Sequence, residues 1–411
     1  MDVLDLCAGI GSFSLAAKQV YGGTYYNTVA CSEVENFCNK VLSKQGYEII
    51  GDLSYIGLPE SQQQYSHLLE MDLVPAEETG FTSISLEDIL EGVVDIKMCI
   101  AGSPCQDVSP ANTGESRGID GSKSSVIHDI MEKVELIEPD IVLIENSSAL
   151  IRKGLHVLLS VFHDLGYIVE WSTVAAANFG YNHYRHRCFI VAYLPKTRIA
   201  QSNASIFKEV SKYANKAPGT KTPLLKNMTQ EQRAFTKVDE TRSIKLRSKR
   251  INAIGNSVVL DVAYAILKSI ADLETKAVDA KQHKLKAKDT LGYMTRNGIV
   301  ETVNYSLFED PAFVEKMPPA GFMSVDGTVY ISARDERLNP KNTAYPDLNS
   351  TLLSRDGNNC FSGKARLTRP GKLGGLVADV MREFGFNQGG LNPVFCERLL
   401  GLPDNITNIF D

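Results

Sequence analysis

The sequence predicts an α/β fold with a doubly wound, mainly parallel sheet covered by helices on both faces. Strand-like apolar runs alternate with stretches of helical periodicity, which is the pattern of repeated strand–helix units. The runs lie at Val3, Thr28, Val93, Ile141, Ile168 and Phe189, and the helical stretches lie around Ala16, Asn39, Ile130 and Val157. Ligands of such sheets bind at the carboxyl ends of the strands, where several reactive residues stand in this chain.

Length and composition agree with a multidomain intracellular protein. A chain of 411 residues with 43% hydrophobic content exceeds the usual single domain, so we expect two domains. The 8 cysteines form no Cys-x-x-Cys pair, so we predict no metal site and no disulfide framework, and a reducing cytoplasm fits best. The sequence predicts neither a signal peptide nor a membrane span.

The first element is a strand that enters a glycine turn. Val3 to Cys7 reads as a short buried strand, Ala8-Gly9-Ile10-Gly11-Ser12 as the turn, and Phe13 to Val20 as a helix. Such a turn lets a ligand approach the backbone closely. Ser14 stands where the dinucleotide fingerprint has its third glycine, so the turn alone is weak support for a nucleotide site.

Acidic residues follow the next two strand-like runs. Glu33 comes after Thr28 to Ser32, and Asp52 comes after Tyr47 to Ile50. Carboxylates at these strand ends could bind the hydroxyls of a ribose and the amino group of an adenine. Either acid taken alone is more simply a helix cap or a turn residue.

A thiol and a carboxylate follow two further strands. Cys105 stands just after the run Val93 to Ile100, and Glu145 ends the run Ile141 to Ile144. Pro104 prevents a helix before the thiol, so the chain should turn there and present Cys105. A cysteine nucleophile beside a carboxyl that can protonate a ring nitrogen indicates covalent catalysis. The alternative is that Cys105 is one more small buried hydrophobic residue.

Two arginines precede the last strand of the predicted sheet. Arg185 and Arg187 alternate with bulky residues of a strand that continues through Cys188 to Ala192, so both guanidinium groups should lie on one face. Without further support, two exposed arginines of an edge strand would be a reasonable alternative.

In their joint order these residues resemble the motifs of the cytosine-C5 DNA methyltransferases. The resemblance covers most of residues 1 to 270 and is carried by seven segments, each too short to be specific alone. The segments are Asp5-Leu6-Cys7-Ala8-Gly9-Ile10-Gly11, Glu33, Gly51-Asp52, Pro104-Cys105-Gln106, Glu145-Asn146-Ser147, His183-Tyr184-Arg185-His186-Arg187 and Ile254-Gly255-Asn256-Ser257-Val258.

The resemblance implies a sheet of the S-adenosylmethionine-dependent methyltransferase type and a mechanism for this chain. Cys105 would add to carbon 6 of a flipped cytosine, Glu145 would hold or protonate N3, Arg187 would hold O2, and Arg185 would contact a phosphate or support the site. The residues that would bind S-adenosyl-L-methionine are Asp5, Cys7, Ala8, Gly9, Ile10, Gly11, Glu33, Val34, Asp52, Leu53, Pro104, Asn256 and Ser257.

The sequence departs from the family pattern at several positions. Cys7 replaces an aromatic residue that would stack on adenine, Ser12 replaces a glycine, Ser147 a valine and His183 a glutamine. None of these changes removes a group that makes or breaks bonds. The polar segment from Ser109 to Ser125 matches the position of the family's closing loop, although any long surface loop could have this composition.

The domain order is unusual for the family. We predict a catalytic domain over residues 1–273, a charged linker over 274–290 and a smaller mixed domain over 291–411 that recognises the target sequence. The stretch Leu391 to Pro403 resembles a motif that elsewhere precedes the Gly-Asn segment, which implies a rearranged order. An unrelated appendage is the alternative for residues 291–411.

The expected partner is duplex DNA, and a cognate restriction endonuclease would be a separate chain. The net charge of -6 speaks against nucleic-acid binding, but basic residues cluster before the Gly-Asn segment and again in the C-terminal part. The rival functions are cytosine methylation in RNA and DNA binding without turnover. The sequence leaves the target bases, the oligomeric state and the biological role open.

Overall fold

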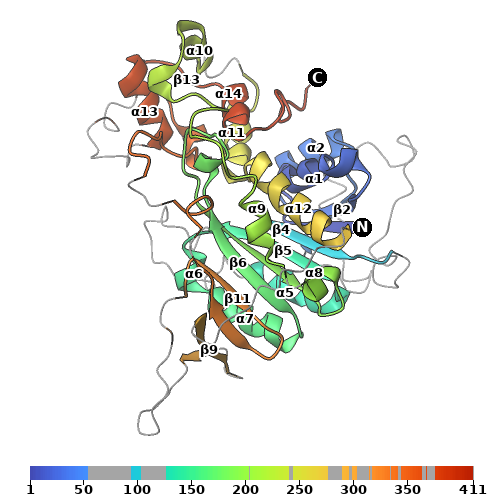
Figure 1. Cartoon of the computed structure of the whole chain (residues 1–411). Helices are drawn as coiled ribbons and strands as arrows, with labels where there is room; N and C mark the ends of the chain where they lie inside the picture. The colour runs from blue at the N-terminus through green and yellow to red at the C-terminus, as the bar shows by residue number, and fades with distance from the viewer. Residues whose placement is uncertain are drawn as a thin grey trace, which may run out of the picture.

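The computed structural model describes residues 1–53, 94–102, 126–202, 204–239, 244–275, 289–295, 299–302, 314, 317–333, 335–340, 344–362, 367 and 375–410. Figure 1 shows a large sheet flanked by helices, with a second, helix-rich lobe beside one end of it. The strands of the sheet are β1 (Asp2–Leu6), β2 (Asn27–Ser32), β3 (Ile49–Gly51), β4 (Met98–Gly102), β5 (Ile141–Ser147), β6 (Ile168–Val174), β7 (Arg187–Tyr193), β9 (Thr290–Met294), β10 (Val300–Thr302), β11 (Ala320–Met323) and β12 (Thr328–Ile331).

Within the described ranges the sheet has eleven strands, in the order β10-β9-β12-β11-β6-β7-β5-β4-β1-β2-β3. The strands from β3 to β5 in this order pair in parallel, which confirms the predicted doubly wound half of the sheet. From β5 onward every pairing is antiparallel, beginning with β7. The expectation of a mainly parallel sheet therefore holds only for β1 to β5, and the whole sheet is mixed.

Alternating side chains of the strands build a core on each face of the sheet. Val3 and Leu143 face one core, while Leu4 and Ile144 face the other, as the two-residue period of a strand requires. The helices α1 (Ser12–Ala17), α2 (Asn36–Lys44), α8 (Arg198–Ser202), α9 (Ile206–Val210) and α12 (Leu260–Thr275) cover the first face, and α5 (Val126–Ile137), α6 (Leu150–Lys153) and α7 (Leu155–Asp164) cover the second (Figure 1).

The predicted boundary at residues 274–290 does not separate two independent domains, which corrects the sequence-based division. Strands β9 to β12 continue the sheet of the predicted catalytic domain, because β11 pairs antiparallel with β6. The Trp171 ring lies against this addition, and its Nε1 donates to the Pro318 carbonyl at 2.9 Å. A Cβ at Gly321 would lie 2.1 Å from the Trp171 ring, so only glycine fits opposite this indole.

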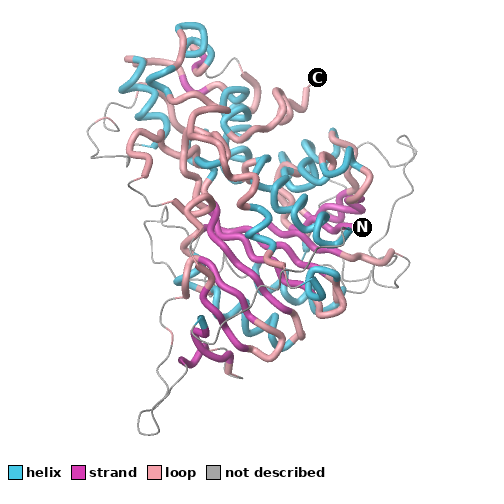
Figure 2. Tube along the Cα trace, viewed as in Figure 1, coloured by secondary structure: helices cyan, strands magenta, loops and turns pink. Residues whose placement is uncertain are grey.

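The second lobe combines two distant stretches of chain. Strand β8 (Lys237–Val238) pairs with β13 (Gly390–Leu391), and helix α11 (Arg247–Asn256) packs against the 3-10 helix η9 (Ser354–Asn358) and against α14 (Pro393–Leu399). Figure 2 shows that this lobe is built mostly of helices and loops. Its remaining elements are η7 (Leu225–Asn227), α10 (Gln230–Phe235) and α13 (Gly375–Phe384).

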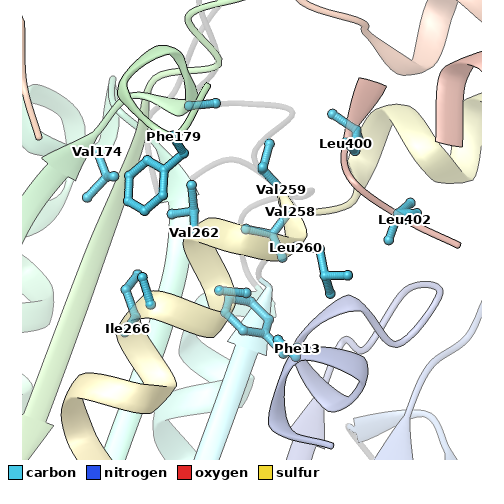
Figure 3. Packing of buried hydrophobic residues seen from close by; sticks show 14 of the residues in the cluster. Phe13, Val174, Phe179, Val258, Val259, Leu260, Val262, Ile266, Leu400 and Leu402 are labelled. Atoms are coloured by element: carbon cyan, nitrogen blue, oxygen red, sulfur yellow. The ribbon is translucent and has the colours of Figure 1, made fainter. Parts of the chain in front are cut away.

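A shared apolar cluster joins the lobe to the sheet. Phe13 from α1, Leu260 from α12, and Leu400 and Leu402 beyond α14 all belong to it (Figure 3). The Leu260 amide also donates to the Leu400 carbonyl at 3.0 Å. By length and composition the described stretch Arg247–Thr275, which forms α11 and α12, could cross a membrane, but 72% of its most apolar window is buried inside the protein.

Candidate active site

A cavity of about 630 Å³ opens at the carboxyl ends of β1, β2, β4 and β5, where a parallel sheet is expected to bind its ligand. Residues from the N-terminal glycine turn, these strand ends and α11 line it. They are Cys7, Ala8, Gly9, Ser12, Phe13, Ser32, Glu33, Val34, Glu35, Cys38, Asp52, Leu53, Gly102, Val126, Asp129, Glu145, Arg187, Lys249, Asn252, Ala253, Gly255, Asn256, Ser257 and Val258.

The glycine turn forms one wall of the cavity. Gly9 has φ +58, and a Cβ added there would have no neighbouring atom within 4 Å, so its backbone faces open space. Gly11 has φ +75, and a Cβ there would lie 2.9 Å from Leu42 Cδ2, so this position requires glycine for both reasons. The turn thus exposes backbone at Gly9 while Gly11 packs closely against α2.

Glu33 is held in place by backbone amides. Its Oε2 accepts from Gly9 N at 2.7 Å, and its Oε1 accepts from Val34 N and Glu35 N, each at 2.8 Å. Burial raises the pKa of this carboxyl, although the three amide hydrogen bonds oppose the shift. A carboxylate has about four acceptor positions, so about one remains, on Oε2, for a ligand hydroxyl.

The residues beside Glu33 give the cavity an apolar edge and an acidic edge. Val34 is 68% exposed although it is aliphatic, and it faces the cavity together with Leu53. Asp52 and Asp129 line the same region, and the charge of Asp52 contributes to a raised pKa of Asp129, after burial and Glu132. A flat, polar-edged group such as a purine would find both kinds of surface here.

Three of the predicted cofactor residues lie behind the cavity wall. Ile10 is fully buried in the core, and Gly11 packs against α2. Asp5 is also buried, and its Oδ2 accepts from Ser14 Oγ at 2.6 Å. The structure thus brings Cys7, Ala8, Gly9, Glu33, Val34, Asp52, Leu53, Asn256 and Ser257 to the cavity, but not Asp5, Ile10 or Gly11.

The predicted carboxyl and arginine meet at the opposite wall. Arg187 Nε lies 3.1 Å from Glu145 Oε1. The register explains the contact: Arg187 is opposite Ser147, which shares a face with Glu145, so the two side chains are diagonal neighbours. The pair is mostly buried, with 19% of the Arg187 side chain and 10% of the Glu145 side chain exposed.

Burial and charge act in opposite directions on Glu145. Burial raises the pKa of its carboxyl above the ordinary value, and the cations of Arg187 and Arg185 lower it, but burial dominates. The carboxyl therefore retains a proton at a higher pH than an exposed glutamate would. A carboxyl of this kind can donate a hydrogen bond or a proton to a ring nitrogen.

Arg185 does not lie on the strand, which corrects the predicted alternation. Its φ is 34, and β7 begins only at Arg187. The buried Arg185 guanidinium donates to the carbonyls of Leu352, Gly255 and Ser257. This side chain therefore supports the backbone behind the cavity and does not face a phosphate in solvent.

Cys105 and Pro104 lie outside the described residues, as does the segment Ser109 to Ser125. The nearest described residue is Gly102, the last residue of β4, and it lines the cavity opposite Glu145 in the strand register. Cys105 follows Gly102 by three positions in the sequence, and three residues of fully extended chain span at most about 11 Å.

Sequence reasoning missed most of the contribution of α11. Lys249, Asn252, Ala253 and Asn256 recur at helical spacing and all line the cavity. Their 3- and 4-residue spacing was a usable signal once the Gly-Asn segment had been placed at a helix end. Asp129 had no such signal, because its position depends on how α5 packs beside β4 and β5.

Comparison with known proteins places this geometry in a family context. A family model described as C-5 cytosine-specific DNA methylase matches residues 1–246. The chain is 36% identical over 126 residues to the Type II methyltransferase M2.BsuMI of Bacillus subtilis, a match covering 28% of this chain and 32% of the relative. It is 35% identical over 105 residues to the Type II methyltransferase M.Sau3AI of Staphylococcus aureus, covering 23% and 25% respectively. The match to the Type II methyltransferase M.HgiBI of Herpetosiphon aurantiacus is 28% over 192 residues, 46% of this chain and 36% of the relative.

Proposed function

The chain belongs to the C-5 cytosine-specific DNA methylase family, and on this premise we propose that it methylates carbon 5 of cytosine in a specific duplex DNA sequence, with S-adenosyl-L-methionine as methyl donor. The observation that carries the proposal is the Glu145–Arg187 pair, which shares one cavity with the glycine turn and Glu33. The matched stretches span about a third or less of the first two relatives, 32% and 25%, so the activity of the whole protein is inferred from the site.

The glycine-turn side of the cavity has the groups that this cofactor needs. The acceptor position left on Glu33 suits a ribose hydroxyl, Val34 and Leu53 offer an apolar surface to adenine, and Asp52 can accept from its amino group. Asn256 and Ser257 would close the other side. When bound, S-adenosyl-L-methionine supplies an electrophilic methyl group on a sulfonium.

The remaining chemistry belongs to the chain. Carbon 6 of an extruded cytosine would be attacked by the Cys105 thiolate, whose electron pair forms the S–C bond and shifts ring electrons toward N3 and carbon 5. Glu145 would give a proton to N3, which accepts the displaced charge. After carbon 5 has been methylated, N3 would return its proton to Glu145, a water molecule would take the proton of carbon 5, and elimination of the thiolate would restore the ring.

Arg187 has two tasks in this scheme. Its guanidinium would donate to O2 of the cytosine, and its Nε holds the Glu145 carboxyl at 3.1 Å. Extruding the base costs a few kcal/mol, and hydrogen bonds to its Watson–Crick edge offset part of that cost. Arg185 contributes through the backbone that it fixes and through its charge, which lowers the pKa of Glu145.

The second lobe is the part of the protein that we assign to reading the DNA sequence. It contributes α11 to the cavity wall, and it combines residues 225–256 with the later part of the predicted 291–411 region, from η9 onward; β9 to β12 belong to the sheet instead. The relatives are named Type II methyltransferases, which favours a restriction–modification role in the cytoplasm with a cognate endonuclease as a separate chain.

Covalent trapping tests the proposal directly. Duplex DNA in which 5-fluorocytosine replaces cytosine throughout contains every target sequence, and with S-adenosyl-L-methionine it should form an adduct that survives denaturing electrophoresis. The Cys105→Ser protein should form none, whereas Cys360→Ser, which removes an exposed thiol of the second lobe, should trap DNA normally. If the protein transfers tritiated methyl groups to transfer RNA but not to duplex DNA, its substrate is RNA and not the proposed DNA. A folded wild-type protein that neither traps nor methylates either nucleic acid would refute the activity.

A further inference from the structure

The four cations that the structure describes just before the Gly-Asn segment, Lys245, Arg247, Lys249 and Arg250, go to different places in the folded protein. Arg247 Nε donates to the Leu391 carbonyl at 2.8 Å, Arg250 Nη2 lies 3.1 Å from Glu397 Oε1, and Lys245 Nζ lies 4.6 Å from the centroid of the Phe410 ring. Lys249 alone among these four lines the cavity. Two of these four cations, Arg247 and Arg250, are therefore buried inside the second lobe, whereas Lys245 and Lys249 are exposed.

Lys249 stands at the end of the cavity nearest the second lobe. It is in the first turn of α11, and Asn256 at the other end of the helix is seven residues further on, about 10 Å along the axis. Its side chain is exposed. Within the described part of the chain, no hydrogen bond or ion pair involves it. Lys249 is thus an exposed cation that lines the cavity from a helix of the second lobe.

The position is an unfavourable one for a cation. The amino end of a helix carries partial positive charge, and the first turn of α11 contains no acidic residue. Arg250, one residue on, is compensated by the buried Glu397 carboxylate. Lys249 has no acidic partner among the described residues, so its ammonium group is available to an anion from outside the chain.

We propose that Lys249 binds a phosphate of the DNA backbone next to the extruded cytosine. This inference rests on the proposed function and extends it to a specific contact. A nucleotide whose base enters the cavity brings its own phosphates to the rim, where Lys249 stands. The alternative anion for Lys249 is the carboxylate of S-adenosyl-L-methionine. To reach Lys249, that carboxylate would have to lie in the same cavity as Glu33, Glu35 and Asp52, but at the end remote from these acids.

Neutral phosphate analogues locate the contact. Methylation mapping of plasmid DNA first identifies the target sequence, and a short duplex is then made in which single phosphates flanking the target cytosine are replaced by methylphosphonates. One replacement should weaken binding by wild-type protein and have no further effect on Lys249→Ala, because both changes remove the same contact.

The salt dependence of binding gives a second readout. Each phosphate contact contributes about 0.9 to the slope of log affinity against log salt, so Lys249→Ala should lower the slope by about that amount. Lys249→Arg should keep the slope. The matched control is Lys245→Ala, which removes an exposed cation from just before the same helix, but one that stacks on Phe410 and does not line the cavity.

Three results would overturn the inference. One is an unchanged salt slope in Lys249→Ala, and another is a methylphosphonate effect that persists in this variant. The third is weaker binding of S-adenosyl-L-methionine without DNA, which would assign Lys249 to the cofactor carboxylate. The first two presuppose that wild-type protein methylates the plasmid, so loss of the proposed function is detected separately, at the mapping step.

Discussion

Arg187 and Glu145 form an ion pair between neighbouring antiparallel strands, with 3.1 Å between Nε and Oε1. The contact follows from the register, because Arg187 is opposite Ser147, two residues from Glu145. The same arrangement determines how much the carboxyl is stabilised in its charged form. Its consequences can be measured on both members of the pair.

The activity should fall with rising pH as Glu145 loses its proton. Burial raises the pKa of this carboxyl, so the protonated form that the proposed chemistry uses persists above the range of an exposed glutamate and is lost as pH rises through the raised value. Single-turnover methylation rates measured against pH should show this alkaline decline. Glu145→Gln should be slower by roughly 100- to 10,000-fold and lack the decline. An identical alkaline decline in Glu145→Gln would assign the titration to another group.

Removing the Arg187 side chain should destabilise the protein as well as inactivate it. Arg187→Ala leaves a largely buried carboxyl without its cation, which costs about 3 kcal/mol in the free energy of unfolding. Urea denaturation followed by circular dichroism measures this cost. The control is Arg152→Ala, which removes an exposed arginine side chain of α6 and should change the free energy of unfolding little. If both variants unfold at the wild-type urea concentration, the ion pair contributes nothing to stability.

Gly255→Ala should disturb the support behind the cavity. A Cβ at Gly255 would lie 2.3 Å from Ser354 N, a backbone atom that cannot turn aside, so η9 must move. Overpacking of this kind costs about 1–3 kcal/mol, which thermal unfolding would detect. Ser354→Ala leaves the backbone contact intact and should behave as wild type. Normal stability of Gly255→Ala would mean that α11 and η9 pack less closely than these distances require.

Asp5 should make stability depend on pH. Burial raises the pKa of its carboxyl from 3.8 to about 7, so the folded protein binds this proton more tightly than the unfolded chain. The stabilisation is fully present below the unfolded pKa and is lost as pH rises through the folded value, a change of up to about 4 kcal/mol. Asp5→Asn stays neutral and should lack this loss. Denaturant unfolding from about pH 4 to about pH 8 compares the two, with Asp2→Asn on the same strand as control. Parallel pH profiles for wild type and Asp5→Asn would contradict the assignment.

The parallel half of the fold could be predicted from sequence because its signals are local. The runs at Val3, Thr28 and Ile141 each became a strand, and Glu33, Asp52 and Glu145 lie at one cavity because parallel strands end at the same edge. The runs at Ile168 and Phe189 also became strands, β6 and β7, but no local signal indicates that they pair antiparallel. Whether β11 would pair with β6 depends on Trp171 meeting Gly321, a contact between residues 150 positions apart.

The incorrect predictions for residues of the candidate active site also arise from contacts between residues far apart in the sequence. The spacing of Arg185 and Arg187 suggested a continuous strand, but the positive φ of Arg185 breaks the alternation so that its guanidinium can reach the carbonyls of Gly255 and Leu352. These carbonyl acceptors come from later parts of the chain, and no sequence pattern near residue 185 indicates them. Asp5 and Ile10 likewise fit the opening motif, but their side chains are buried behind the glycine turn and do not line the cavity.

The way in which α11 is enclosed also sets a limit on how this protein can fold during synthesis. Arg247 bonds to Leu391, and Arg250 bonds to Thr407 and Glu397, contacts that span 144 to 157 positions. During synthesis these guanidinium groups can find their acceptors only after residues 391 to 407 have been translated, and contacts of such long range form slowly. Until those residues have been made, α11 and the Gly-Asn segment at its end lack these contacts, so the cavity wall that α11 forms cannot be completed earlier.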